Sequence, residues 1–303
     1  FYSDAADRFD MDFLWKPSCC KSFAIIESEA AYRVLDYESS IKEIEDVLNR
    51  SEYKRIDLFL GAGIGITSGL PPGKELRKMA LQELTNDHLT EEEEVLLKKA
   101  VPLSENIPTD INKVNFELIM SVLREVRLIG DLTQTKAFKY FEKRNEIAEA
   151  KPSEGYEFLK KIAERGIIVL SVTTNFDQIL EHNLPSPQVL VDDDDFVPSN
   201  FKSILSGEPK HVVVKLHGCR SRANSLKFRI DQTSKLSPMK KEFMKFYKTD
   251  GRPAGSFTGV FFIGYDFVDR DIFEDLTEKI NMQRIRPIIV NPFRTASVRS
   301  FMQ

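Results

Sequence analysis

Apolar runs of strand length alternate with amphipathic segments along most of the chain, and this alternation predicts an α/β fold. The runs are apolar at successive positions, a pattern typical of parallel strands that are covered on both faces. They occupy residues 56–60, 167–173, 189–191, 211–216, 259–264 and 286–290. Repeated strand, helix and strand segments predict a Rossmann-like, doubly wound parallel sheet.

Apolar residues three and four positions apart predict helices before and between these strands. The helices are expected at 39–50, 71–84, 156–166 and 269–280. The third of them ends on Gly166, a residue suited to the left-handed conformation that closes many helices.

Residues 86–150 interrupt the alternation with three further helical patterns, at 90–101, 115–129 and 135–150. We expect this segment to form a helical insertion module over one end of the sheet, within a domain that spans 51–303. The first 36 residues show no clear period. We interpret residues 1–50 as an N-terminal arm or edge attachment followed by a helix.

Composition narrows the classes of partner. A net charge of -4 provides no general field for nucleic acid or anionic membranes, so we expect neither to bind. No run approaches the roughly 18 consecutive apolar residues of a membrane span. The three cysteines form no C-x-x-C pair, so we expect no structural zinc and no other metal, and their low, odd number fits a reducing, cytoplasmic compartment.

The stretch GAGIGITSGLPPG, at 61–73, follows the first predicted strand directly. A strand that leads through a glycine turn into a helix can direct backbone N–H groups at an anion, so dinucleotide phosphates could occupy the space that side chains would fill. The stretch does not fit G-x-G-x-x-G strictly, and it lacks the Lys-Ser/Thr of a P-loop, which argues against ATP or GTP hydrolysis. A tight structural turn is the alternative.

Polar residues also follow other predicted strands, where parallel sheets place their ligands. Asn175 and Asp177 follow the second strand, although Asp177 could serve only as a helix N-cap. His217 precedes a glycine at the end of the fourth strand, and an imidazole can accept a proton near neutral pH. Gly264 and Asn291 follow the last two strands. We therefore expect five strand exits to converge on one crevice.

Taken in order, GAGIGITSGLPPG, TTNFDQILE, KLHG, IGYDFVDRDI and IIVNP resemble the sirtuin-like NAD-consuming domains, most closely the zinc-free branch of prokaryotic antiviral defence systems. The resemblance implies that Asn175 and His217 form the catalytic pair and that Asp177 lies in the nicotinamide-side pocket. It also implies NAD contacts from the glycine turn and from the exits of the last two strands. The expected NAD-binding residues, besides Asp177, are Gly61, Ala62, Gly63, Thr67, Gly69, Gly264, Tyr265, Asp266 and Asn291.

Two positions depart from the family pattern. Gly65 and Asp266 stand where the family commonly has serine, so a hydroxyl that could bind ribose or phosphate is lost at each place. Asp266 could instead hold a ribose diol and so favour NAD over its 2′-phosphorylated relative.

The resemblance leads to the hypothesis of an NAD glycohydrolase that releases nicotinamide and ADP-ribose. The family analogy further implies a gated effector of antiviral defence, controlled by oligomer assembly, a fused domain or a partner chain. A module that senses NAD or a derivative without consuming it is the alternative, which the two departures support. Protein deacylation is disfavoured because the zinc cysteines of that branch are absent.

Overall fold

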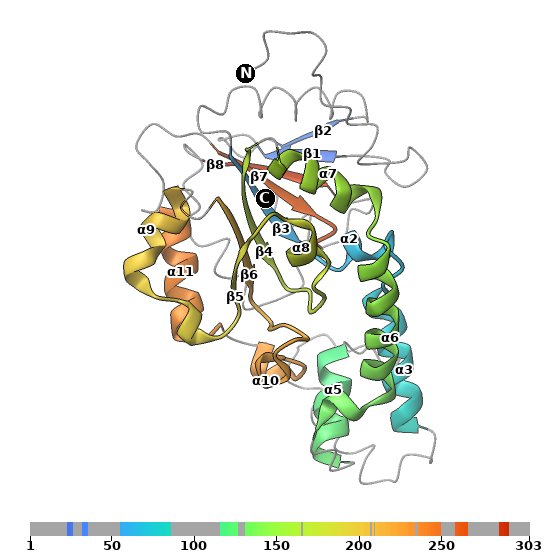
Figure 1. The fold of residues 1–303 in the computed structure, drawn as a ribbon. Helices are drawn as coiled ribbons and strands as arrows, with labels where there is room; N and C mark the ends of the chain where they lie inside the picture. Colours follow the sequence, from blue (N-terminus) through green and yellow to red (C-terminus); the bar gives the residue numbers. More distant parts are fainter. Residues whose placement is uncertain are drawn as a thin grey trace.

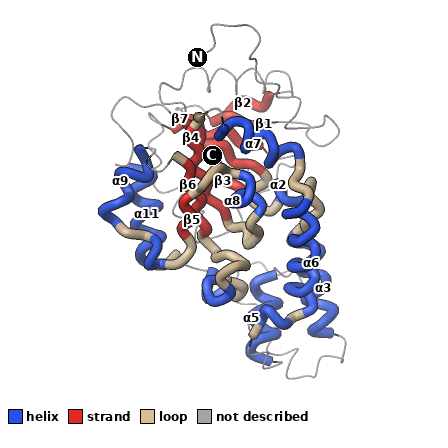
Figure 2. The backbone as a smooth tube through the Cα atoms, in the orientation of Figure 1, coloured by secondary structure: helices blue, strands red, loops and turns tan. Residues whose placement is uncertain are grey.

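An eight-stranded sheet forms the centre of the computed structural model and is flanked by helices (Figures 1 and 2). The structure describes residues 23–26, 32–35, 55–85, 116–126, 131–164, 166–206, 208, 210–233, 236–249, 258–265 and 285–290. The strand order is β2-β1-β8-β7-β3-β4-β6-β5.

The six strands predicted from the sequence are all present, each to within one residue at either end. The strands are β1 (Phe23–Ile26), β2 (Tyr32–Leu35), β3 (Arg55–Leu60), β4 (Ile168–Thr173), β5 (Gln188–Leu190), β6 (His211–Lys215), β7 (Thr258–Ile263) and β8 (Ile285–Val290). Strands β3 to β8 pair in parallel, which confirms the predicted doubly wound parallel sheet. Strands β1 and β2, which the sequence did not predict, add an antiparallel pair beyond β8.

Four of the nine helices among the described residues, those that begin at 73, 116, 136 and 154, fall where periodicity predicts them. The nine helices described are α2 (Gly63–Ile66), α3 (Gly73–Thr85), α5 (Phe116–Val126), α6 (Lys136–Ala150), α7 (Glu154–Glu164), α8 (Ile179–Asn183), α9 (Pro198–Ser206), α10 (Ile230–Thr233) and α11 (Pro238–Thr249), with short 3₁₀ turns η4 (Leu132–Gln134), η5 (Asp193–Asp195) and η6 (Ala223–Ser225). Gly166, just after α7, has the expected left-handed backbone at φ 82°. The helices expected at 39–50, 90–101 and 269–280 lie outside the described residues.

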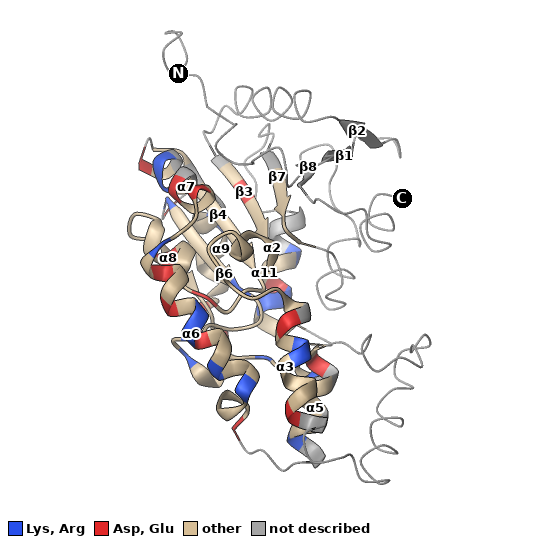
Figure 3. Ribbon diagram, turned by 90° about the vertical axis from the view of Figure 1, so that its right-hand side faces the viewer, with Lys and Arg blue, Asp and Glu red and all other residues tan. Residues whose placement is uncertain are grey.

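Alternate residues of the strands enter two separate cores, one on each face of the sheet. In β3, Leu58 and Leu60 pack on the side of α3, α6, α7 and α8, whereas Phe59 packs on the side of α9 and α11. Charged side chains lie mainly on the helices, and the strands between them are largely uncharged (Figure 3). The continuous apolar runs thus arise because both faces are covered.

The centre of the parallel sheet is β3, which pairs with β4 on one side and with β7 on the other. Connections diverge at this strand, and the crevice outside the carboxyl ends at such a point is the usual ligand site of doubly wound sheets. Helices α5 and α6 both pack against α3, and α5 lies beyond the strands of the sheet (Figure 1).

Just after β3 and β7 end, the two backbone segments approach each other so closely that no space remains for side chains between them. A Cβ atom on Gly264 would lie 2.7 Å from the Cα of Gly63 and 2.7 Å from the amide nitrogen of Ile64. Gly264 also has φ 60°, a conformation that side chains disfavour. Glycine is therefore required here by the packing of one backbone on another.

Substitution Gly264→Ala should lower the free energy of unfolding by about 2 kcal/mol or more, because it combines left-handed strain with a backbone clash. Gly73→Ala is the matched control, since a Cβ at that helical position meets nothing within 4 Å. The control should remain within about 1 kcal/mol of the wild type. Urea unfolding followed by circular dichroism measures both, and equal stabilities would contradict the packing argument.

Candidate functional site

The glycine turn after β3 is fixed mainly by bonds to β7. The amide of Gly61 donates to the carbonyl of Ile263 at 3.0 Å, and the amide of Gly63 donates to the carbonyl of Gly264 at 3.1 Å. The space that their side chains would occupy is filled by the backbone of Gly264 and Tyr265. Close packing of the backbone thus explains why glycine occupies both positions. The expected contact of these glycines with the NAD phosphates stays a prediction.

The outer part of the same turn is more accessible. Ala62 and Thr67 are exposed, and the Thr67 hydroxyl donates to the carbonyl of Ile64 at 3.2 Å. Gly69 has φ 90°, and its carbonyl accepts a 2.8 Å bond from Arg144 of α6. The insertion therefore holds the far end of the turn, while Ala62 and Thr67 are the predicted NAD-binding residues that face outward.

Asn175 lies beside this turn, at the end of β4. Its side-chain nitrogen Nδ2 donates to the carbonyl oxygen of Gly61 at 3.0 Å. The Thr173 hydroxyl donates to the carbonyl of Leu60 at 2.8 Å and accepts a 3.0 Å bond from the amide of Asn175. These three bonds join the exits of β3 and β4 and fix the orientation of the Asn175 amide.

His217 occupies the next exit along the sheet. Strand β4 pairs with β6 with Thr173 opposite Lys215, so Asn175 and His217 each lie two residues beyond a paired position. His217 is 4% exposed, and its carbonyl accepts a 2.9 Å bond from the amide of Lys227. The structure therefore places the two predicted catalytic residues at adjacent strand ends, with the imidazole buried.

Gly218 allows the chain to fold back directly after His217. It has φ 95°, and a Cβ there would lie 2.8 Å from the Cα of Leu226. The returning loop runs over residues 219–229 and closes over the β6 exit.

Asp177 lies directly before Gln178, the N-cap residue of α8, and is 3% exposed. Its carboxylate accepts a 3.1 Å bond from the amide of Ile179, so its side chain binds the first turn of the helix although Asp177 is not the N-cap residue. Burial raises the pKa of Asp177, and the nearby Lys215 ammonium only partly opposes that rise. The predicted contact with the nicotinamide side of NAD is not tested by this geometry.

Lys215 and Glu181 form a buried ion pair that the search for motifs missed. Their Nζ and Oε1 atoms are 2.7 Å apart, and the side chains are 1% and 7% exposed. Burial lowers the pKa of Lys215, but the carboxylates of Glu181 and Asp177 outweigh it and leave that pKa above its usual value. The available signal was a single lysine within an otherwise apolar run, HVVVKL.

Four aromatic rings connect the β4 exit to the insertion. Phe176, between Asn175 and Asp177, packs edge-on against Phe141 of α6 at 6.2 Å and against Phe228 at 5.2 Å between ring centroids. Phe228 also packs against Phe138 of α6 at 5.2 Å. This aromatic cluster (Phe138, Phe141, Phe176 and Phe228) holds the segment 175–177 on one side.

At the β7 exit, Gly264 is half-buried and Tyr265 is 2% exposed. The Tyr265 ring lies 6.2 Å from the ring of Phe59, in the core on the α9 and α11 side. Asp266 and Asn291 lie outside the described residues. The predicted adenosine contacts of these four residues therefore stay predictions.

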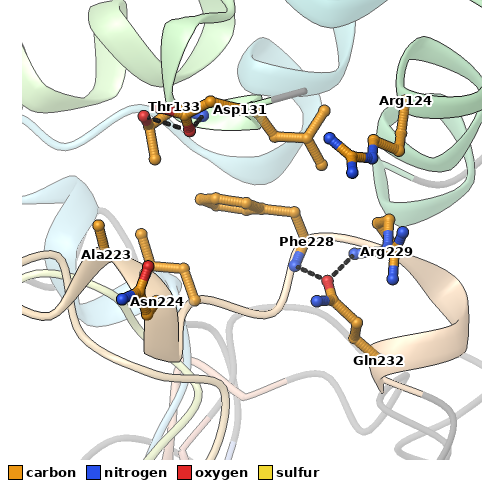
Figure 4. A pocket seen from close by; sticks show the side chains of 10 residues that line it. Arg124, Asp131, Thr133, Ala223, Asn224, Phe228, Arg229 and Gln232 are labelled. Carbon is orange, nitrogen blue, oxygen red and sulfur yellow. Dashed lines mark hydrogen bonds between the residues drawn. The ribbon is translucent and has the colours of Figure 1, made fainter. Parts of the chain in front are cut away.

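A cavity of about 230 Å³ lies between the insertion and the loop that follows His217 (Figure 4). It is lined by Arg124, Asp131, Leu132, Thr133, Ala223, Asn224, Leu226, Phe228, Arg229 and Gln232. None of the predicted site residues lines this cavity. Its wall shares Phe228 with the aromatic cluster, so the cavity adjoins the candidate site without containing it.

The family model of the SIR2-like domain matches residues 169–289 of the chain. The match includes the exits of β4, β6 and β7 and begins after the glycine turn. No curated protein matches the chain. The match supports a sirtuin-like domain and, with it, an NAD-related activity.

The described residues lack two further features. No group of histidine, cysteine and carboxylate side chains suited to a metal ion occurs among them. Within the same part of the chain, no helix combines the length and the apolar character needed to cross a membrane.

Substitution Thr173→Val keeps the side-chain shape but removes the hydroxyl that binds the Leu60 carbonyl and the Asn175 amide. The free energy of unfolding should fall by about 1 to 3 kcal/mol, because the Thr173 hydroxyl is buried and joins two polar groups of the backbone. Thr67→Val, at an exposed threonine, should change it by less than about 0.5 kcal/mol. Chemical denaturation of both variants measures this difference, and similar losses would argue against the link.

Lys240 of α11 is 2% exposed, and burial lowers its pKa to about 8 from 10.5. Between these two values the unfolded chain binds a proton that the folded protein does not, so folding stability rises with pH. Compared with Lys240→Met, the wild type should gain roughly 2 to 3 kcal/mol in unfolding free energy from pH 7 to pH 10. Parallel pH profiles for the two proteins would contradict a depressed pKa.

Proposed function

We propose that this chain is an NAD glycohydrolase that cleaves NAD to nicotinamide and ADP-ribose. The SIR2-like match supports a domain that acts on NAD. The observation that carries the reaction is the placement of Asn175 and His217 at adjacent strand exits, beside the turn after β3. An amide and an imidazole in this arrangement can orient and deprotonate a water molecule.

Cleavage of NAD is a reaction that a protein can accelerate largely by positioning the ribose and the attacking water. Nicotinamide leaves readily because its pyridinium ring becomes neutral when the bond to ribose breaks, and the ribose carbon becomes oxocarbenium-like. The protein must then hold the ribose and deliver water to it, and fixed geometry can supply much of the rate.

Asn175 orients the reacting groups in this proposal. Its Nδ2 is engaged by the Gly61 carbonyl, so Oδ1 is the atom that accepts a hydrogen bond from water or from a ribose hydroxyl. His217 then accepts the proton from that water as general base. Because its imidazole is 4% exposed, productive binding requires the loop after β6 to move outward.

NAD would extend across the exits of β3 and β7. Ala62 and Thr67 are the exposed residues among the predicted contacts in the turn, so they are the strongest candidates for contact with the pyrophosphate. Gly63, Gly69 and the β7 exit would shape the floor beneath it. Asp266 and Asn291 complete the proposed adenosine side.

Substitutions Asn175→Ala and His217→Ala should each reduce nicotinamide release by roughly 100-fold or more, since each removes one polar group from the reacting centre. Chromatography of NAD reaction mixtures measures the loss. Asn200→Ala and His182→Ala are matched controls, because these residues are exposed on α9 and α8. Full activity in both site variants would reject the assignment, provided that the controls are active.

One observation favours the second candidate function, an NAD sensor. The amides of Gly61 and Gly63 are occupied by β7, and His217 is buried, so binding without turnover is compatible with this arrangement. Isothermal titration with NAD, with nicotinamide measured in the same samples, separates the two functions. Heat of binding without nicotinamide release identifies the sensor.

The hydrolase would act as the gated effector of an antiviral defence system in the cytoplasm. Uncontrolled loss of NAD harms the host, so activity would depend on assembly of a homo-oligomer or on a fused or partner regulatory chain. This part of the proposal rests on the family resemblance.

A further inference from the structure

The side chain of Lys215 ends directly beneath the segment that carries Asn175. Its ammonium group donates to the carbonyl oxygen of Asn175 at 3.3 Å and also to the carbonyl oxygen of Asp177. The Glu181 carboxylate, at 2.7 Å, balances the charge. One buried cation therefore fixes both ends of the 175–177 segment and the helix that follows it.

A second lysine fixes the strand from which Lys215 projects. Lys240 reaches from α11 and donates to the carbonyls of Lys215 and Leu216 at 3.0 and 2.9 Å. These carbonyls belong to the two residues immediately before His217. The lysine clamp, defined as Lys215 and Lys240, thus connects the segment of Asn175 to the segment of His217.

Stability alone gives little reason for such a clamp. Removing two charges from water is costly, and apolar residues of similar volume often replace a buried ion pair without loss of stability. Neighbouring positions of β6 are valines, so an apolar side chain at 215 would match the run that surrounds it. A directional cation can hold carbonyl oxygens at fixed positions, which an apolar side chain cannot do.

We propose that Lys215 is a positioning residue that sets the location of Asn175 relative to His217. This inference rests on the proposed function for its catalytic consequence. The ammonium group contacts neither water nor substrate in the reaction. It acts through the backbone of residues 175 and 177.

The test compares wild type with Lys215→Met/Glu181→Met, which replaces the ion pair by apolar side chains and leaves Asp177 as the remaining buried carboxyl, whose pKa is already raised by burial. Lys215→Met alone is expected to be unstable, because Glu181 would keep a buried charge without its cation. Lys210→Met, exposed at the start of the same strand, is the control. If the double variant does not fold, Lys215→Met/Glu181→Gln carries the same measurements, since it also removes the ammonium group and leaves no charged carboxylate at 181.

Two readouts are expected to change in the double variant at unchanged fold content. The kcat for NAD hydrolysis should fall roughly 10- to 100-fold while KM changes less than about 3-fold, because misplacement affects the reacting groups more than the binding of NAD. Hydrogen exchange over residues 174–179 should accelerate by at least about 10-fold, because the segment loses its anchor.

A stable variant with wild-type kcat, or with wild-type exchange over 174–179, would overturn the positioning role. If the wild-type protein leaves NAD intact, the proposed function is contradicted. Hydrogen exchange over residues 174–179 then decides by itself whether the lysine clamp holds this segment. Faster exchange confined to 174–179, with Lys210→Met unchanged, supports the inference in either case.

Discussion

The hydrogen bond between the Asn175 side chain and the Gly61 carbonyl is the constraint on which the candidate site depends. Gly61 is held beside β4 because its own amide donates to the carbonyl of Ile263 in β7. Asn175 can reach the Gly61 carbonyl because Thr173 links β4 to β3. Three strands of the sheet thus determine the direction of one amide group.

The charged groups beneath the site also help to fix the position of Asn175. Glu181 and Asp177 are buried carboxyl groups with raised pKa values, and Lys215 is a buried cation with a raised pKa. Such a set is costly to remove from water, and its members face the carbonyls and the helix start behind Asn175 and not the exposed turn. Charge in this region therefore acts on the backbone more than on a ligand.

The sequence predicted the parallel sheet well because strands covered on both faces are continuous apolar runs, which are easily recognised. It missed β1 and β2 because they have only four residues each, and β2 also carries a charged residue, Arg33. It located Asn175 and His217 through strand ends but could not show why the glycines are present. A missing side chain looks the same in sequence whether a phosphate or another backbone fills the space, and only the contact of Gly63 with Gly264 distinguishes them. Lys215 was missed because its partners are backbone carbonyls, which no motif records.

The aromatic cluster has a mechanical consequence for the candidate site. Phe138 and Phe141 belong to α6, whereas Phe176 separates Asn175 from Asp177. Rings packed edge to face at these distances transmit displacement, since close-packed interiors deform little. A displacement of α6 would therefore be passed through these rings to the segment 175–177, so α6 and the candidate site are mechanically coupled.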